Sequence, residues 1–568
     1  MHIKKFSIPI FIIGIFFLVS ENFGQSKNNN YSPANDKIIE SSNLPLVVID
    51  TYGKTIENNV KINARMKIIY NDPPQRNSVS DPGNIYDGNV GIEIRGTYSA
   101  SLPQKPYGFE TRDSLGNNLN VSLLNMPAEN DWILLANYND KVFMRNTLAF
   151  DLFRKMGHYQ MNTRICEVIL NDEYRGIYVL TEKIKQDKNR VNISKLTSAD
   201  TSGEDVTGGY IIKIDYDDGT GKDGWLSHYP AIDRPGSRPY FIYHYPKPYE
   251  ILDKQKQYIQ SYITRIDSVL RSTNWSDSSE GYRKYLNVSA FIDYFIVGEV
   301  SRNVDAYKKS AYFYKDRDDK DGRLQPGPVW DFDWAWKNIN ECMVNGIDGS
   351  GWTYLISSVC RSSPVPPGWV VKLLEDDTFT NELRTRYDQL RKTILSEEYF
   401  NHYIDSVYSL VSEAQVRHYE KWPILGRNVG TPEVDDQPKT FEGEITKFKN
   451  WISTRIKWLD VNMPGKDLLG VNTQDTNMLP DNFILYQNYP NPFNPDTKIN
   501  YQLPVKCKVV IKIYNMLGQE IETLVNKFQN EGLHSILYTN HSMLPSGAYF
   551  YQIRTENYIE TKKMILIK

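Results

Sequence analysis

The sequence predicts a mixed α+β fold with a β-rich N-terminal lobe, a helical C-terminal lobe and a small all-β sandwich at the end of the chain. Between positions 44 and 99, alternating runs such as LPLVVIDTYG, VKINARMKIIY and VGIEIRGTYS are separated by Gly, Asn and Pro. Between positions 369 and 463, long segments are amphipathic with helical spacing. After position 480, short alternating runs such as Val509 to Tyr514 return.

The first residues have the pattern of a secretory signal peptide, which we place at residues 1–24. A basic start at Lys4 and Lys5 precedes an apolar run from Ile8 to Val19, and small residues follow near Gly24. Residues 25–42 are polar and are expected to form a flexible leader. We therefore expect an exported protein whose mature chain has no transmembrane span, because no later run is apolar for long enough.

A central unit is expected over residues 43–463, followed by a polar linker at 464–480 and the sandwich at 481–568. Within the central unit, residues 141–157 have the spacing of an amphipathic helix that stops at a glycine. Residues 163–185 read as two strands around a turn, and YIIKID begins a further strand at position 210. Helices are expected at about 254–272 and at 288–303, and the second of these leads directly to Asp305.

Composition argues against several classes of partner and site. Lys+Arg 66 against Asp+Glu 69 gives a formal net charge of −3, so nothing attracts the chain as a whole to nucleic acid or to anionic lipid. The four cysteines are too few for a disulfide scaffold, although Cys342 and Cys360 flank one loop and either pair or remain free. No zinc-binding motif is present.

The stretch from Asn303 to Trp334 carries acidic residues on each side of an expected hairpin. Asp305 lies in a short loop before a Tyr- and Phe-rich strand, and Asp331 begins DFD after the hairpin. Phosphoryl transfer needs one carboxylate to orient the attacking hydroxyl and another to hold a metal, so the layout predicts a phosphotransferase. The alternatives are that Asp305 caps the preceding helix and that Asp331 belongs to a turn whose tryptophans pack inward.

Other acidic runs are expected to be loops. KDRDDKDGR at 315–323 lacks the spacing of a calcium loop and fits a solvated hairpin tip. Asp215, Asp217 and Asp218 also read as a loop, and the alternative is that they approach the phosphotransfer site.

The C-terminal motifs YPNPFNP, YNMLGQE and SGAYFYQI resemble the type A C-terminal sorting domain of the type IX secretion system, over about residues 480–568. The resemblance implies that the type IX secretion machinery is a partner. It also implies passage through the periplasm to the outer cell surface or the medium. The alternative is an ordinary carbohydrate-binding or adhesive sandwich.

Five segments in the central unit resemble the CotH kinase family, a group of secreted atypical kinases, over about residues 89–462. They are IEIRGTYSASLPQKPYGFE, MRNTLAFDLFRKMG, LNDEYRGIYVLTEKIKQDKNRVNI, NVDAYKKSAYFYKD and GPVWDFDWAWKN. The resemblance implies an atypical protein-kinase-like core, ATP and Mg²⁺ or Mn²⁺ as cofactors, and a secreted or cell-surface protein as substrate.

The resemblance also implies roles for individual residues. Asp305 would orient the acceptor hydroxyl, and Asp331 would bind the metal with Asp333 as a second ligand. The implied nucleotide-binding residues are Arg95, Lys105 in a strand beside it, Glu182 as the ion-pair partner of Lys105, and Arg145, which either binds phosphate or forms a salt bridge inside the lobe.

One residue departs from the protein-kinase pattern. Five positions after the catalytic aspartate, protein kinases carry an asparagine for a second metal, and here that position is Ser310. A hydroxyl is a weaker metal ligand, so a non-catalytic surface, assembly or adhesin protein on the same fold remains the main alternative. A third possibility is transfer of a nucleotide or an amino acid in place of phosphate.

Overall fold

The computed structural model describes residues 39–217, 219–340, 348–360, 364–466, 483–485, 488, 491, 493, 495–539, 544–556 and 558–567. The predicted signal peptide, most of the predicted leader and linker, and Cys342 lie outside these residues. The chain divides into two units, residues 1–468 and 469–568, which are described separately.

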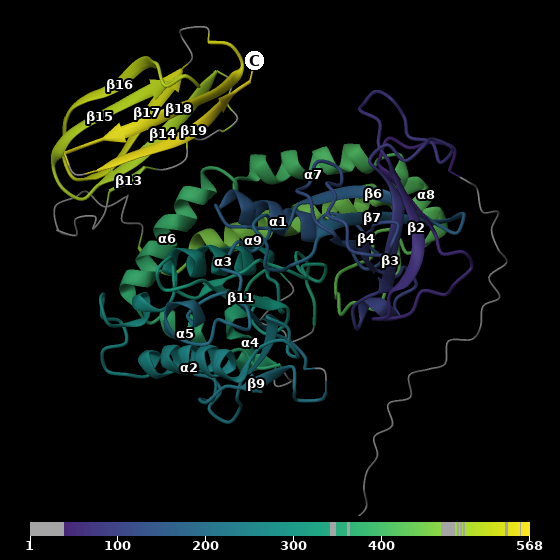
Figure 1. Ribbon diagram of the computed structural model, residues 1–568, viewed down its shortest axis with the longest axis horizontal. Coiled ribbons are helices and arrows are strands. Elements are labelled where there is room, and N and C mark those ends of the chain that lie inside the picture. Colours follow the sequence, from purple (N-terminus) through teal and green to yellow (C-terminus); the bar gives the residue numbers. More distant parts are fainter. Residues whose placement is uncertain are drawn as a thin grey trace, which may run out of the picture. The chain divides into compact units, whose positions relative to one another are not determined.

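The first unit opens with a closed barrel whose strands follow the order β1-β2-β3-β4-β5-β7-β6 (Figure 1). The barrel strands are β1 (Leu46–Asp50), β2 (Ile62–Ile69), β3 (Tyr86–Ile94), β4 (Tyr107–Arg112), β5 (Asp131–Ala136), β6 (Thr163–Leu170) and β7 (Glu173–Glu182). Neighbours are antiparallel except β1 and β6, whose parallel pairing closes the barrel. Alternate side chains such as Met66, Val90 and Trp132 fill the interior, as the two-residue period of a strand requires.

The end of the predicted leader belongs to this unit. Ser42 exchanges backbone hydrogen bonds with Asn77, and Ile39 is buried beside the barrel. The prediction of a flexible leader as far as residue 42 is therefore wrong for its last four residues.

A second sheet follows, with the strand order β12-β11-β8-β10-β9. Its strands are β8 (Tyr210–Ile214), β9 (Gly224–Leu226), β10 (Tyr240–Tyr245), β11 (Ala311–Lys315) and β12 (Gln325–Pro326). The expected hairpin after Asp305 is present, because β11 and β12 pair antiparallel, although β12 is only two residues long. The sheet brings the ends of β8 and β11 together, with Tyr312 opposite Lys213.

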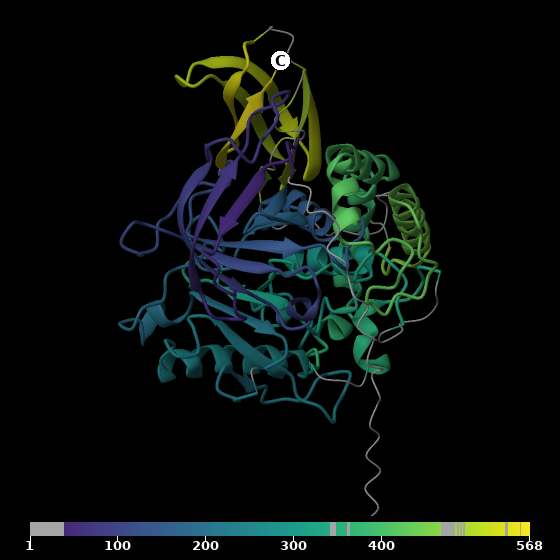
Figure 2. The same ribbon diagram turned by 90° about the vertical axis from the view of Figure 1, so that its right-hand side faces the viewer.

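Helices form most of the rest of the unit, and those of its last part, drawn in green, gather on one side of the barrel (Figure 2). The helices of the unit are α1 (Arg145–Lys155), α2 (Asp253–Leu270), α3 (Val288–Ser301), α4 (Ile356–Val359), α5 (Trp369–Leu373), α6 (Asp377–Arg391), α7 (Glu397–Val411), α8 (Ala414–Lys421) and α9 (Phe441–Asn462). Almost every side chain of α3 is buried, as expected for a helix that is apolar on all faces. Because α3 packs against α1, α6 and α9, it provides a rigid base for the loop that follows it.

The helix predicted at residues 141–157 begins later than expected. Phe143 has a φ of 61°, outside the helical region, and α1 starts only at Arg145. Both carboxylate oxygens of Asp140 accept backbone N–H groups, from Val142 and Arg145, so Asp140 terminates the preceding loop and supports the start of α1.

The second unit is the predicted sandwich. One sheet has the order β13-β14-β17 and the other β16-β15-β18-β19. The strands are β13 (Ile484–Leu485), β14 (Asp496–Leu503), β15 (Cys507–Tyr514), β16 (Glu520–Gln529), β17 (Gly532–Thr539), β18 (Gly547–Arg554) and β19 (Ile559–Leu566). The two sheets share one core, in which Ile499 and Tyr538 meet Ile511 and Tyr551.

Among the described residues, no helix is both long and apolar enough to cross a membrane. Cys166 and Cys507 are free thiols, and burial inside the barrel raises the pKa of Cys166 to about 12. Cys360 is in a disulfide, whereas Cys342, with which the sequence left pairing open, lies outside the described residues.

Candidate functional site

Asp305 lies in the loop that joins α3 to β11. The last turn of α3 ends at Arg302, whose φ of 50° places it in the left-handed region and turns the chain away from the helix axis. Asp305 therefore follows the helix end and does not cap it. Its carboxylate lies 2.9 Å from Nζ of Lys308 and 3.3 Å from Nζ of Lys309, so two lysines hold it from one side.

The DFD segment is a second loop, anchored at several points to the helices. Asn146 of α1 accepts the backbone N–H of Phe332 at 2.7 Å, and the backbone N–H of Trp336 donates to the carbonyl of Ser301 at 2.7 Å. Asp331 itself has a φ of 70°, which turns its side chain out of the run of buried neighbours and leaves the residue exposed.

Asn303 connects the two loops, and sequence reasoning did not identify it. This buried side chain accepts the backbone N–H of Asp305 at 3.1 Å and donates to the carbonyl oxygen of Asp331 at 3.3 Å. The sequence signal that could have identified Asn303 is a polar residue directly after a helix that is apolar on all faces. Asn303 thus fixes the two aspartates relative to each other.

The carboxylates of Asp331 and Asp333 are close enough to share a hydrogen bond. The crowding of protein around Asp331, followed by the charges of Asp333, Asp305 and Asp215, raises its pKa well above the usual value. Burial also raises the pKa of Asp333. Hydrogen bonds with Asp331 and from Asn139 lower this pKa, but by less than burial raises it. The charges of Asp305 and of the loop residue Asp215 therefore both act on Asp331.

Cationic side chains face the carboxylates from the two sheets. Arg95, at the end of β3, lies with its guanidinium 5.5 Å from the ring centre of Trp330, and its pKa is lowered by burial but supported by the charge of Asp331. Lys213, at the end of β8, pairs with Asp215 at 2.7 Å. Burial lowers the pKa of Lys213, and the nearby Tyr312 and Asp215 more than compensate, so that it is raised overall. Arg95 was among the candidate residues of the sequence analysis, whereas Lys213 was not.

The predicted ion pair between Lys105 and Glu182 is not formed. Lys105 precedes β4 instead of lying in a strand, and its ammonium donates to the carbonyl of Ala100 at 2.9 Å. Glu182 is fully buried and pairs with Arg190 at 3.0 Å, and it also accepts from the backbone and side chain of Asn162. This difference arises because Arg190, which follows β7 in the chain, folds back to the end of that strand.

Arg145 forms a salt bridge inside the lobe. Its guanidinium donates to Asp140 at 2.6 Å and lies 5.2 Å from the ring centre of Phe448 on α9. The side chain is buried, so of the two predicted roles the structure shows the salt bridge.

Comparison with protein families now assigns the two units. Residues 92–459 match the model of the CotH kinase protein family. The chain belongs to the CotH kinase family. Residues 487–568 match the secretion system C-terminal sorting domain, so the same chain carries a sorting module. No curated protein matches the sequence.

The CotH unit has a donor set suited to a hard divalent cation. Among the described residues no group of three or more His, Cys, Asp or Glu side chains forms a metal site. Mg²⁺, however, is usually bound through one or two carboxylates together with substrate phosphates and water. Asp331 and Asp333 supply two such carboxylates, and the hydroxyl of Ser310 lies 3.4 Å from Oδ2 of Asp331. A cation between the two carboxylates would offset the charge of Asp333, which, after burial, raises the pKa of Asp331.

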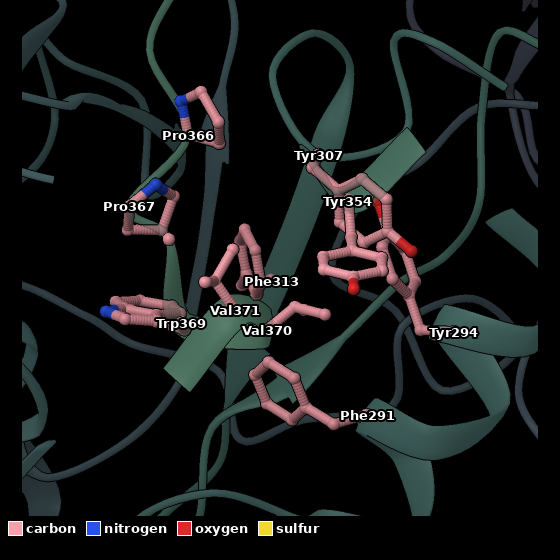
Figure 3. Close-up of a pocket in the computed structure, with 11 residues that line it drawn as sticks. Phe291, Tyr294, Tyr307, Phe313, Tyr354, Pro366, Pro367, Trp369, Val370 and Val371 are labelled. Carbon is pink, nitrogen blue, oxygen red and sulfur yellow. The ribbon is translucent and has the colours of Figure 1, made fainter. Parts of the chain in front are cut away.

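Beneath the Asp305 loop of the CotH unit lies a small apolar cavity of about 30 Å³ (Figure 3). Tyr307 and Tyr354 lie on one side of it and Trp369 on the other, with Phe313 between them. The hydroxyl of Tyr294 donates to the carbonyl of Ala306, directly after Asp305. No carboxylate or cationic side chain of the described part of the chain lines the cavity, so the cavity is separate from the charged site. Its aromatic lining packs behind the Asp305 loop.

A buried ion pair completes this support. Glu299 on α3 and Arg455 on α9 are both fully buried and lie 3.2 Å apart. Glu299 also accepts the hydroxyl of Tyr307 at 3.2 Å and the backbone N–H groups of Thr353 and Tyr354 at 2.9 and 2.8 Å. The pair therefore links α3 and the Asp305 loop to α9.

Proposed function

We propose that the CotH unit is an exported, ATP-dependent protein kinase that transfers a phosphoryl group to hydroxyl side chains of a secreted or cell-surface protein. The observation that supports this most directly is the convergence of Asp305, Asp331 and Asp333 with Arg95 and Lys213. One such set of residues provides carboxylates for a metal and an acceptor hydroxyl, and cations for phosphate oxygens.

In the proposed reaction, Asp305 accepts a hydrogen bond from the acceptor hydroxyl and takes its proton as the oxygen attacks the γ-phosphorus. The new bond joins the acceptor oxygen to phosphorus, and the bond from phosphorus to the β,γ-bridging oxygen breaks, so ADP leaves. Lys308 and Lys309, at 2.9 and 3.3 Å, hold the Asp305 carboxylate in place. Arg95 and Lys213 would contact the phosphate oxygens, and Lys213 would then have the role that the sequence suggested for Lys105.

Asp331 and Asp333 would hold Mg²⁺ or Mn²⁺, with Ser310 as a weak additional ligand. When bound, the cation neutralises negative charge on the nucleotide phosphates. In this proposal the barrel and the β8–β12 sheet form the nucleotide-binding lobe of a kinase-like core, and the helices from α3 onward form the second lobe.

The sorting domain indicates secretion to the cell surface or the medium and an interaction with the type IX secretion machinery. The acceptor proposed here is therefore a protein that meets the kinase during or after export.

A second candidate is a non-catalytic surface or assembly protein on the same fold. It is favoured by the contacts of Asp305, because a carboxylate held by two lysines also serves as a purely structural ion pair. Ser310 at the position of the second metal ligand points the same way.

Mass spectrometry separates these functions. Purified protein incubated with ATP and Mg²⁺ or Mn²⁺, alone and with mixed secreted proteins, should gain mass in steps of one phosphate. Asp305→Asn should abolish that gain, whereas Asp319→Asn at the exposed hairpin tip should not. Absence of both phosphate transfer and nucleotide binding in the folded wild type would select the non-catalytic role. Addition of a nucleotide would select nucleotide transfer.

A further inference from the structure

The sorting module presents two bulky apolar side chains on a tight turn between β15 and β16. Met516 is 67% exposed and Leu517 is 82% exposed. Both follow Asn515, and Gly518 comes after them with a φ of 75°. Other exposed apolar side chains of the described part of this unit, such as Phe528 at 67% and Ile559 at 58%, lie on strands, whereas Ile511 and Ile513 are buried in the core. Met516 and Leu517 are neighbours in the chain and lie together on one turn.

The turn is rigid without any contribution from these two side chains. The side-chain oxygen of Asn515 accepts the N–H groups of Leu517 at 2.9 Å and of Gln519 at 3.0 Å. The backbone N–H of Asn515 donates to the carbonyl of Gln519, and Lys512 pairs with Glu520 at 2.6 Å across the base. Asn515 and Gly518 thus set the conformation, as in other turns stabilised by an Asn side chain. Nothing in the turn requires apolar residues at positions 516 and 517.

A second turn in the chain has the same construction and shows what the shared geometry alone produces. In the CotH unit, Asp113 accepts the N–H groups of Leu115 and Asn117, and Gly116 has a φ of 88°. Leu115 is 85% exposed, so a turn of this construction can expose a leucine at the position before its glycine. The position before it is Ser114, whereas the sorting module has Met516. The pair of adjacent apolar side chains is therefore particular to the sorting module.

We propose that Met516 and Leu517 form the contact by which the sorting module docks into an apolar pocket of a protein of the secretion machinery. The match to a secretion-system sorting domain establishes what kind of partner this unit must meet. A preordered turn loses little conformational entropy on binding, so the burial of two large apolar side chains is converted efficiently into affinity. Methionine and leucine at the tip of a hairpin are suited to insertion into a pocket, because the strands behind them remain paired and do not move.

The test is export of the full-length chain from a bacterium that has the matching secretion system, measured as the fraction of protein in the medium and on the cell surface against the periplasm. The double variant Met516→Ser/Leu517→Ser should lower the exported fraction by about tenfold or more, because each buried apolar side chain alone is worth roughly that factor in affinity. Leu115→Ser, in the equivalent turn of the other unit, is the matched control and should be exported normally. Phe528→Ser is a second control, since Phe528 is also 67% exposed but lies at the far end of the same hairpin.

Thermal unfolding of the purified proteins shows whether each variant is folded. Leu517→Asp is an independent variant, because this side chain has almost no packing to lose, and it should also accumulate in the periplasm. The variant Met516→Leu/Leu517→Met exchanges the two side chains and keeps both positions apolar. Its normal export would confirm that the contact depends on apolar character. Normal export of folded Leu517→Asp, or an equal loss with Leu115→Ser, would overturn the proposal.

Discussion

Removal of Arg455 should destabilise the CotH unit strongly, because this residue neutralises a carboxylate that has no access to water. Both Glu299 and Arg455 have fully buried side chains. The guanidinium of Arg455 also donates to the carbonyls of Glu299, Gly349 and Gly351 at 2.8, 2.8 and 2.6 Å. Because both side chains are enclosed, burial lowers the pKa of Arg455 to about 10 and raises that of Glu299.

We expect Arg455→Met to lower the free energy of unfolding by about 4–6 kcal/mol. Leaving one partner of a buried pair without the other costs roughly 3–5 kcal/mol. The three carbonyl hydrogen bonds add about 1 kcal/mol each, and packing of the methionine side chain offsets part of this sum. The double variant Glu299→Gln/Arg455→Met should be more stable than the sum of the single effects predicts, because no charge remains buried.

Urea unfolding followed by tryptophan fluorescence measures these differences. Arg65→Met is the matched control, since Arg65 pairs with Asp87 at 2.8 Å on the surface, with side chains 50% and 44% exposed. That change should cost no more than about 1 kcal/mol. A cost below about 1.5 kcal/mol for Arg455→Met, or strict additivity in the double variant, would refute the claim that the pair is a buried, mutually neutralising unit.

Three further results are expected. Asp333→Asn should raise the unfolding temperature of the metal-free protein by about 1–3 °C, because it relieves the repulsion at Asp331, and it should abolish the stabilisation by Mg²⁺; an unchanged response to Mg²⁺ would contradict the proposed ligand. Burial lowers the pKa of His418 to about 3, below its value in the unfolded chain, so stability should fall as the pH drops from 6.5 towards 3, by up to about 1.4 kcal/mol per pH unit. His418→Asn should remove this slope in urea titrations at several pH values, while the exposed His402→Asn keeps it; equal slopes would argue against a buried neutral imidazole. Ser310→Asn should leave stability unchanged, because the φ of 49° suits asparagine, and should tighten Mg²⁺ binding in calorimetric titrations; unchanged binding would exclude position 310 from the metal site.

The sequence was informative where a role depends on neighbouring residues in the chain. Asp305 follows a buried helix and Asp331 follows a hairpin, so their loops could be identified from local patterns, and the structure brings them into one site. The C-terminal sandwich could also be predicted from the sequence, because the strict alternation of apolar residues along β15 and β18 indicates which face of each strand is buried.

Pairing between segments that are distant in the chain could not be predicted from the sequence in the same way. Closure of the barrel depends on the parallel pairing of β1 with β6, and alternation along a strand does not identify its partner. The assignment of Glu182 to Lys105 failed for the same reason, because a residue from the loop after β7, Arg190, reaches Glu182. Lys213 was missed because its place beside Tyr312 follows from the register of β8 against β11.

The start of α1 shows a further limit of periodicity. The apolar spacing continues through Phe143, but the Asp140 side chain binds the backbone N–H groups that a longer helix would use. Side-chain competition of this kind is local, yet it does not alter the pattern of apolar residues.

The most direct test of the account is a crystal structure of the full chain with Mn²⁺ and a non-hydrolysable ATP analogue. The account predicts an anomalous manganese peak between the carboxylates of Asp331 and Asp333, phosphate oxygens against Arg95 and Lys213, and the γ-phosphate facing Asp305. Manganese bound elsewhere, or a nucleotide that leaves Asp305 and Asp331 without contact to the metal-phosphate group, would contradict it.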